Sequence, residues 1–271
     1  MSKIKKKVGQ IGKTEQMEKI EKEILNLKKS PLYSERIKNK VFPVIGEGSF
    51  DAKIMFVGEA PGKNEAKTGK PFCGASGRVL DELLDSIKLK REDVYVTNIV
   101  KDRPTANRDP SKEEIKIYGP FLDRQIEIIQ PKVIATLGRY SAEYIMKKFD
   151  LDSKIETIGK MHGKVFETNF FVPINSGSLR RQAPREDRDE VAVVSANLSV
   201  MEGDSVAVQS PVSASPVRDK KSETSVISNG ARHEAVQKKI KIIPLLHPAV
   251  VLYNAFSRSD LKKDFKVLKK F

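Results

Sequence analysis

Three short motifs in the sequence carry side chains able to bind or activate a ligand. A glycine-rich turn, Gly58–Gly62, contains Glu59; Asn98 ends an apolar run; and His247 precedes a proline. A carboxylate can act as a base, an amide can read the edge of a small molecule, and an imidazole can donate a hydrogen bond. Each residue also has an ordinary alternative role, because Asn commonly forms turns and a His before Pro is commonly structural.

The glycine-rich turn does not have the pattern of a phosphate-binding loop. Gly58, Gly62 and Lys63 do not fit G-x-x-x-x-G-K-[ST], and no G-x-G-x-x-G follows. The sequence therefore disfavours a nucleotide-triphosphate or dinucleotide site, although a nucleotide-binding domain remains one alternative.

Apolar runs bounded by turn residues predict the strands that must position these motifs. Strands are predicted at Lys53–Val57, Val94–Val100 and Val133–Leu137, with two later strand-like segments at Lys164–Glu167 and Ile240–Leu246. Helical spacing of apolar residues predicts helices at Gly77–Ile87, from Ser111 to about Ile129 and at Ser141–Lys148. The second of these helices opens with a capping box, Ser111 with Glu114.

The alternation of strands and helices predicts an α/β fold. We expect a three-layer α/β/α sandwich with a central, mainly parallel four-stranded sheet. Ligands bind beyond the carboxyl ends of the strands in such sheets. The glycine-rich turn, Asn98 and His247 follow three of these ends, so we expect them to lie at one edge.

Composition narrows the class of protein. The 271 residues include 50 Lys+Arg and 36 Asp+Glu, a formal net charge of +14, with one cysteine and no tryptophan. A lone Cys73 excludes an intramolecular disulfide or a four-thiolate metal site. With no apolar run of about 18 residues and no apolar segment after Met1, we expect a soluble intracellular protein, in the cytoplasm or nucleoid if prokaryotic. The basic excess favours a polyanion such as nucleic acid.

The charge is concentrated outside one segment. Residues 176–237 have no aromatic side chain, eleven Ser, and eight basic against nine acidic residues, so the remainder carries 42 − 27 = +15. Such a composition predicts a mostly disordered insert, with Val191–Val194 and Val206–Val208 as alternative short strands. Ser-Pro pairs at Ser210 and Ser215 are possible phosphorylation sites, against the alternative of a passive loop.

The insert sets the predicted domain organisation. We expect a basic N-terminal helical segment at 1–30, a main α/β domain at 31–175 and 238–271, and the insert between its two parts at 176–237. An insert of this length adds little closure entropy, since that cost grows logarithmically with loop length.

Four motifs in order resemble those of family 4 uracil-DNA glycosylases. They are Gly58-Glu59-Ala60-Pro61-Gly62; Thr68 to Gly74 with Gly77; Thr97 to Lys101 with Arg103-Pro104 and Asn107-Arg108; and His247-Pro248-Ala249. The resemblance runs from about residue 20 to the C-terminus and is interrupted by the insert. It implies hydrolysis of the bond between uracil and deoxyribose in single- or double-stranded DNA, which leaves an abasic site.

The resemblance assigns the base pocket to three residues. Phe72 would stack on the uracil of a flipped nucleotide, with a core Phe as the alternative, and Ala60 would contribute to substrate binding. Asn98 would donate to uracil O4 and accept from N3–H. Cytosine carries a hydrogen-bond donor at position 4 and an acceptor at N3, so the same amide would meet mismatched groups.

The catalytic roles fall to three further residues by the same resemblance. His247 would face uracil O2, where negative charge accumulates as the base leaves. Glu59 or the further acidic residue Glu65 would orient the attacking water and stabilise positive charge on the sugar, and Glu65 would also help to exclude the 5-methyl group of thymine. The family usually carries Asp after that second Glu, but this chain has Ala66.

DNA contacts are predicted on either side of the pocket. Leu252 and Tyr253 match the family loop that fills the gap left by the flipped nucleotide, although they also fit the start of the last helix. Arg103 and Arg108 are predicted to contact DNA. We expect a monomer that does not associate with membranes.

The resemblance also implies an iron–sulfur cluster, which the sequence contradicts. The family's four cysteines align with Leu27, Ser30, Asp102 and Tyr118. We therefore predict no cofactor, no metal and replacement of the cluster by packing or ion pairs, Asp102 with Lys101 or Arg103 being one candidate pair.

A catalytically inactive DNA-binding relative that uses the insert for partner docking is the rival hypothesis. The lost cysteines favour it. The retained Glu59, Phe72, Asn98 and His247 favour the enzyme, because a pure binder does not need all four. No lysine is assigned as a nucleophile, so the predicted enzyme is a monofunctional hydrolase.

Overall fold

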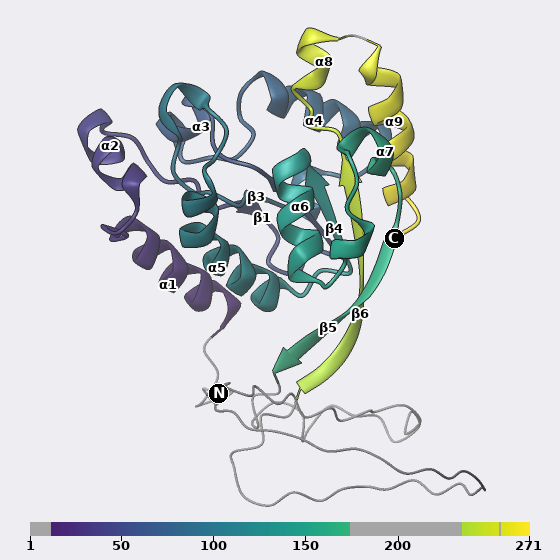
Figure 1. Ribbon diagram of the computed structural model, residues 1–271, viewed down its shortest axis with the longest axis horizontal. Coiled ribbons are helices and arrows are strands. Elements are labelled where there is room, and N and C mark those ends of the chain that lie inside the picture. Colours follow the sequence, from purple (N-terminus) through teal and green to yellow (C-terminus); the bar gives the residue numbers. More distant parts are fainter. Residues whose placement is uncertain (1–11, 174–234, 255) are drawn as a thin grey trace, which may run out of the picture. The chain divides into compact units, whose positions relative to one another are not determined.

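The structure is a computed structural model that describes residues 12–173, 235–254 and 256–271 (Figure 1). The chain divides into two units, residues 1–172 with 237–271, and residues 173–236. The predicted insert falls in the second unit except for its last residue, and most of it, including Val191–Val194, Val206–Val208, Ser210 and Ser215, lies outside the described residues. No helix within the described ranges is long and apolar enough to cross a membrane.

Within the described residues, six strands form one sheet in the order β1-β3-β2-β4-β6-β5 (Figure 1). The strands are β1 (Glu47–Gly48), β2 (Ile54–Gly58), β3 (Tyr95–Asn98), β4 (Val133–Leu137), β5 (Phe166–Pro173) and β6 (Ala235–Leu245). Strands β3, β2, β4 and β6 run parallel, whereas β1 pairs antiparallel with β3. Parallel central strands are covered on both faces, so β2, β3 and β4 are buried throughout.

Helices and short 3₁₀ turns connect these strands. The α-helices are α1 (Lys13–Leu25), α2 (Pro31–Asn39), α3 (Lys63–Thr68), α4 (Ala75–Ser86), α5 (Lys112–Ile129), α6 (Arg139–Lys148), α7 (Ile158–Met161), α8 (Val250–Tyr253) and α9 (Ser257–Leu268). The 3₁₀ turns are η1 (Arg91–Asp93), η2 (Thr105–Asn107) and η3 (Asp152–Lys154). The predicted capping box is present at the start of α5, where Ser111 and Glu114 bond reciprocally.

Two apolar cores lie on opposite faces of the sheet, because alternate residues of a strand point to opposite sides. Met55 and Val57 of β2 pack in one core with α1, α5 and α6. Ile54 and Phe56 pack in the other with α4 and α9, where Phe56 stacks on Phe265 at 5.7 Å between ring centroids. The predicted α/β/α sandwich is confirmed.

The sheet is larger than the four strands predicted from sequence. The four parallel strands are the predicted ones, and β1 and β5 extend the sheet at its two edges. β1 has only two residues, too short to show period-two alternation. β6 begins at Ala235, so its first three residues, Ala235–Gln237, lie inside the range predicted as insert.

The helix in the predicted N-terminal segment belongs to the same core as the sheet. Met17, Ile20 and Ile24 of α1 are buried in the cluster that also contains the apolar face of α5. Helical spacing places these three residues on one face, which explains why α1 packs as an integral layer. Residues 1–11 lie outside the described ranges.

Candidate functional site

The carboxyl ends of four parallel strands meet at one edge of the sheet and carry the predicted chemistry there. The register pairs Gly58, the last residue of β2, with Asn98, the last of β3. Leu137 of β4 pairs with Leu245 of β6, two residues before His247. This common edge opens into a pocket of about 290 Å³. The predicted site residues that line it are Glu59, Ala60, Glu65, Phe72, Asn98, Arg108 and His247.

Asn98 presents an unused hydrogen-bonding atom to this pocket. The residue is 2% exposed, and its Oδ1 has no hydrogen-bond partner among the described residues. Behind it, Lys101 Nζ donates to the Asn98 backbone carbonyl over 2.7 Å. A buried amide oxygen without a partner is costly to fold, so its retention points to a ligand donor.

Phe72 and Gly58 shape the floor of the pocket around this amide. A β-carbon built on Gly58 would lie 2.3 Å from Asn98 Oδ1 and 2.8 Å from Phe72 Cζ. Phe72 has a positive φ of 48° and packs in the core while also lining the pocket. The core and binding interpretations of Phe72 are therefore compatible, because its ring serves both surfaces.

His247 is a neutral hydrogen-bond donor at the pocket wall. Burial lowers its pKa to about 4, although the nearby Glu65 charge opposes this shift. The backbone N–H of Ala249 donates to His247 Nδ1 over 3.2 Å. Because Nδ1 accepts, the single proton of the neutral ring is on Nε2, which can donate to a ligand. The His247 and Phe72 ring centroids lie 5.7 Å apart.

Glu59 lies against the start of α6, and the pKa of its carboxyl is raised. Burial raises the pKa of its carboxyl, and the bond from the Tyr140 backbone N–H does not fully offset this. That N–H donates to Glu59 Oε1 over 3.1 Å. A half-buried carboxylate at the edge of a pocket has the character of a general base.

Glu65 holds the loop that carries Phe72. Its Oε1 accepts from the backbone N–H groups of Cys73, at 3.1 Å, and Gly74, at 2.9 Å. These bonds give the Glu65 side chain a structural role in this loop. Ala66, where the family usually has Asp, is 1% exposed and has no polar group to satisfy.

The two arginines predicted to contact DNA are both engaged within the chain. Arg108 lines the pocket and donates to both oxygens of the buried Glu114, at 2.9 and 2.5 Å. Arg103 does not line it, and its Nε donates to Asn107 Oδ1 over 2.7 Å. Part of the Arg108 charge is thus neutralised by Glu114.

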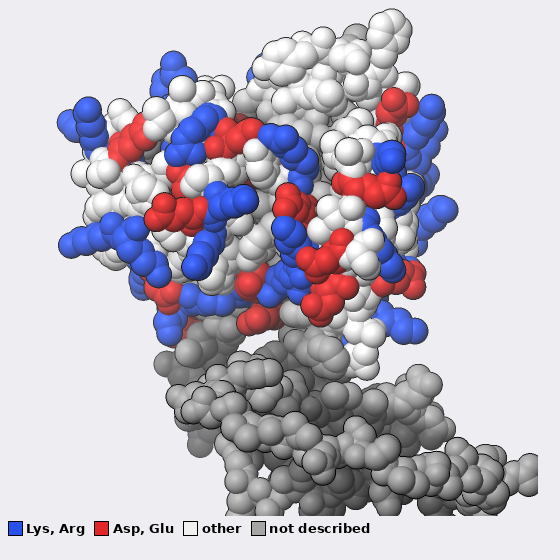
Figure 2. All heavy atoms as spheres, in the orientation of Figure 1, with Lys and Arg blue, Asp and Glu red and all other residues white. Residues whose placement is uncertain are grey.

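An apolar projection stands beside the pocket at α8. Tyr253 is 89% exposed and Leu252 is 49% exposed, whereas Ala249 at the start of this turn lines the pocket. Phe256 is also 89% exposed, which sequence analysis missed because its spacing suits a helix start. In Figure 2 the tip that corresponds to α8 in Figure 1 carries no charged side chain on the visible face.

Asp109 is a pocket residue that sequence analysis did not identify. Its Oδ2 accepts from Arg139 at 2.7 Å and from the Tyr140 hydroxyl at 2.9 Å, and its charge helps to raise the pKa of Glu59. The sequence signal for Asp109 was its position directly after Arg108, a residue that we predicted to contact DNA. Its partners lie 30 and 31 residues away, and no local pattern connects them.

The four positions aligned with cluster cysteines do come together, but they do not fit iron. Tyr118 donates to Asp102 Oδ2 over 2.6 Å and lies 2.8 Å from Ser30 Oγ, while Leu27 packs in the apolar core. Iron–sulfur clusters need soft thiolate ligands, which this set lacks. No group of three or more His, Cys, Asp or Glu side chains in the described residues could hold a metal ion. The predicted pairing of Asp102 with Lys101 or Arg103 was wrong, because its cationic partner is Arg36.

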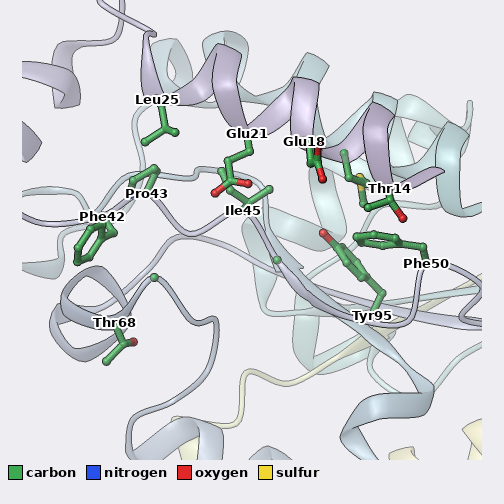
Figure 3. A pocket seen from close by; sticks show the side chains of 13 residues that line it. Thr14, Glu18, Glu21, Leu25, Phe42, Pro43, Ile45, Phe50, Thr68 and Tyr95 are labelled. Atoms are coloured by element: carbon green, nitrogen blue, oxygen red, sulfur yellow. The ribbon is translucent and has the colours of Figure 1, made fainter. Parts of the chain in front are cut away.

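A second cavity, of about 400 Å³, lies between α1 and the segment leading into β1 (Figure 3). Glu18 and Glu21 descend from α1 toward Tyr95 and Ile45 at its wall. The Tyr95 hydroxyl already accepts from Gln125 over 3.2 Å. Acidic side chains repel phosphates, so this cavity does not suit nucleic acid.

Comparison with known proteins agrees with the geometry of the first pocket. The model of the uracil DNA glycosylase superfamily matches residues 45–269. A type-4 uracil-DNA glycosylase of Archaeoglobus fulgidus is 47% identical over 252 residues, which are 93% of this chain and 91% of that protein. One from Thermotoga maritima is 42% identical over 171 residues, 55% of this chain and 86% of that protein. The chain therefore belongs to the uracil DNA glycosylase superfamily and is similar to type-4 members of it.

Proposed function

We propose that this protein is a DNA repair enzyme that hydrolyses the N-glycosidic bond of uracil in DNA, releasing uracil and leaving an abasic site. The observation that carries the proposal is the buried Asn98 amide with its unpartnered oxygen, in a pocket with the Phe72 ring and the His247 donor. The type-4 relatives support the reaction, and the basic excess of the chain suits a polyanionic substrate.

Asn98 reads the base. Its unpartnered Oδ1 accepts from uracil N3–H, and its Nδ2 donates to O4. Cytosine presents an acceptor at N3 and a donor at position 4, so both contacts become mismatched. Each mismatch costs about 1–3 kcal/mol in a buried site, enough to select uracil. Phe72 stacks on the base, and Ala60 lines the same pocket.

His247 stabilises the leaving group. As the glycosidic bond breaks, its electron pair passes to the base and negative charge develops on O2. The Nε2–H of the neutral imidazole donates to that oxygen, which contributes about 3 kcal/mol by analogy with oxyanion holes. Because the pKa of His247 is about 4, the ring acts as a hydrogen-bond donor and stays neutral near pH 7.

Glu59 acts on the sugar side of the bond. Its carboxylate orients the water that attacks C1′, accepts its proton and stabilises the positive charge that develops on deoxyribose. Glu65 acts by positioning, since its Oε1 is bonded to two backbone N–H groups of the Phe72 loop. No lysine lines the pocket within the described residues, which supports a monofunctional hydrolase.

The exposed tip formed by Leu252 and Tyr253 fills the space left in the DNA when the nucleotide flips into the pocket. Phe256 adds a second exposed ring at this tip. Arg103 and Arg108 precede α5 in the chain, and they contact DNA phosphates next to the flipped nucleotide. We expect the enzyme to work as an intracellular monomer without a membrane partner.

A gel assay on an oligonucleotide with one uracil tests this proposal. Wild-type protein should give alkali-dependent strand cleavage, with no cleavage before alkali and no borohydride-trapped adduct. If the wild-type protein released no uracil, the proposed activity would be excluded. The rival hypothesis of a catalytically inactive DNA-binding protein would then be favoured.

Substitution of His247 tests the assigned mechanism. His247→Ala should lower kcat by about 10²-fold or more, because the donor to O2 is lost. His162→Ala is the control, since His162 bonds Asp264 and does not line the pocket. Undiminished activity in His247→Ala would overturn the role of this residue.

A further inference from the structure

Two consecutive charged residues are buried in the segment that connects the parts of the base pocket. Lys101 is 0% exposed and Asp102 is 1% exposed. Asn98 precedes them, and the pocket-lining stretch from Pro104 to Pro110 follows. The interactions that fix these two side chains therefore also fix the positions of Asn98 and of the pocket-lining stretch from Pro104 to Pro110.

Asp102 is fixed by partners from two helices, α2 and α5. Arg36 Nη1, from α2, donates to both carboxylate oxygens at 3.0 Å. The Tyr118 hydroxyl, from α5, donates to Oδ2 over 2.6 Å. Ser30 Oγ lies 2.8 Å from that hydroxyl and also accepts from the Leu32 backbone N–H, which caps the start of α2.

Arg36 extends the same network to the end of α1. Its Nη1 donates to the Ile24 carbonyl over 3.2 Å and its Nη2 to the Leu25 carbonyl over 2.6 Å. The side chain thus satisfies carbonyls that the helix end leaves without an intrahelical partner. Arg36, Asp102, Tyr118 and Ser30 form a buried network that joins α1, α2, α5 and the segment after β3.

Lys101 anchors the same segment through a second set of hydrogen bonds. Its Nζ donates to Thr97 Oγ1 at 2.7 Å, to the Asn98 carbonyl at 2.7 Å and to Gln125 Oε1 at 2.6 Å. Burial lowers the pKa of this ammonium, and three close acceptors compensate for its desolvation. The two neighbouring side chains therefore both tie this short stretch of backbone to α5, Lys101 through Gln125 and Asp102 through Tyr118.

The stretch that follows needs such anchoring because its backbone is strained. Ala106 and Asn107 have positive φ angles of 53° and 56°, which residues other than Gly rarely adopt. Left-handed residues persist where the surrounding structure determines the conformation. Arg108, Asp109 and Pro110, which come next, line the pocket.

The network also occupies the positions where the family resemblance implies a metal cluster. Ser30, Asp102 and Tyr118 align with three of its cysteines, and Leu27, the fourth, lies in the adjoining apolar core. Their polar atoms already bond to one another and to Arg36, so no free donor set remains for iron.

We propose that the Arg36–Asp102–Tyr118–Ser30 network positions the pocket segment 98–110. The kinetic part of this inference rests on the proposed function. Asp102, Arg36, Tyr118 and Ser30 are positioning residues, since none of them lines the pocket.

Asp102→Asn and Tyr118→Phe test the network in the full chain. Asp102→Asn removes the charge that Arg36 needs, and Tyr118→Phe removes one hydroxyl while keeping the ring in the core. We expect Asp102→Asn to lower kcat/KM for uracil release by about 10-fold to 10²-fold, with a smaller effect for Tyr118→Phe. KM should rise more than kcat falls, because Asn98 binds the base.

Hydrogen exchange provides a measurement that does not depend on catalysis. In both variants the amides of residues 98–110 should exchange faster than in the wild type, at a temperature where circular dichroism shows each variant folded. If wild-type protein released no uracil, the proposed function would fail while this measurement still tested the positioning role.

Glu23→Gln is the matched control. Glu23 pairs with Arg124, so this pair also joins α1 to α5, but both side chains are more than a third exposed and they hydrogen-bond to each other. We expect unchanged kcat, KM and exchange of residues 98–110 in this variant.

Three results would overturn the proposal. Lower melting temperatures in Asp102→Asn and Tyr118→Phe, with unchanged KM, kcat and exchange, would reduce the network to a stabilising element. Equal effects in Glu23→Gln would indicate general destabilisation. Stoichiometric iron with the absorbance of an iron–sulfur cluster in freshly purified protein would mean that the chain holds a cluster by other ligands.

Discussion

Gly58 determines whether the pocket can admit a base. Since its added β-carbon would meet Asn98 Oδ1 at 2.3 Å and Phe72 Cζ at 2.8 Å, Gly58→Ala must displace the amide, the ring or both. We expect kcat/KM for uracil release to fall by about 10²-fold, because small misplacements of binding groups are costly. Steady-state kinetics on a single-uracil oligonucleotide measure this loss.

Gly159→Ala is the control for that substitution. Gly159 lies in α7, and a β-carbon there would have nothing within 4 Å. Its kinetics should match the wild type, and both variants should keep the wild-type circular dichroism spectrum. Wild-type kcat/KM in Gly58→Ala would show that the base binds elsewhere.

The pH dependence of catalysis should report Glu59. Burial raises the pKa of this carboxyl above its ordinary value of 4.5, so the active carboxylate is lost as pH falls through a midpoint above that value. His247, with a pKa of about 4, is neutral over this range and does not set the midpoint. A pH profile of single-turnover rates should therefore fall on its acid side, and Glu59→Gln should give a low rate without this fall. A wild-type rate that is flat down to pH 4.5 would contradict the assignment.

Residue types at strand ends were predictable, but their partners were not. Asn98 and His247 each stand at or just after the end of an apolar run, which is visible in the sequence. Parallel pairing then brings the ends of these runs to one edge of the sheet. The partner of Asp102 is Arg36, 66 residues away, whereas the partners predicted from sequence were its charged neighbours Lys101 and Arg103. Long-range pairing depends on how α1, α2 and α5 pack, which local patterns do not encode.

The start of α5 allows a test at the level of one element. Ser111 Oγ accepts from the Glu114 backbone N–H, and Glu114 Oε2 accepts from the Ser111 N–H. Ser111→Ala should lower the free energy of unfolding by about 1 kcal/mol, because a helix-end N–H loses its partner. Urea unfolding followed by circular dichroism measures the change.

Thr157 is the matched control for this cap. It is the N-cap residue of α7, but its side chain makes no capping hydrogen bond. Thr157→Ala should therefore change the free energy of unfolding less than Ser111→Ala does. Equal losses in the two variants would show that the capping box of α5 adds no stability.

Elements with strong local signals were predicted closely, and weak ones were not. The apolar run Val133–Leu137 has the observed bounds of β4, and the capping box located the start of α5. The two-residue β1 and the length of β5 were missed. Edge strands form through pairing with a neighbour, so their extent depends on the sheet more than on their own sequence.

At the scale of the whole molecule, the fold should tolerate removal of the insert. β5 and β6 are neighbours in the sheet, so a short Gly/Ser linker can join them. Replacing residues 176–234 while sparing all of β6 should leave uracil release within about twofold of the wild type, since closure entropy changes slowly with loop length. The single-uracil assay and a thermal melt of the shortened protein check this. Lost base excision in a still-folded protein would contradict a passive insert.

The unpartnered oxygen of Asn98 limits how this protein can evolve. Burying an amide oxygen without a hydrogen bond costs about 1–3 kcal/mol. An apolar side chain of similar size would recover that stability and abolish the distinction between uracil and cytosine. Selection for heat resistance and selection for accurate excision therefore act in opposite directions at this position, so adaptation to higher temperature has to proceed through residues outside the pocket.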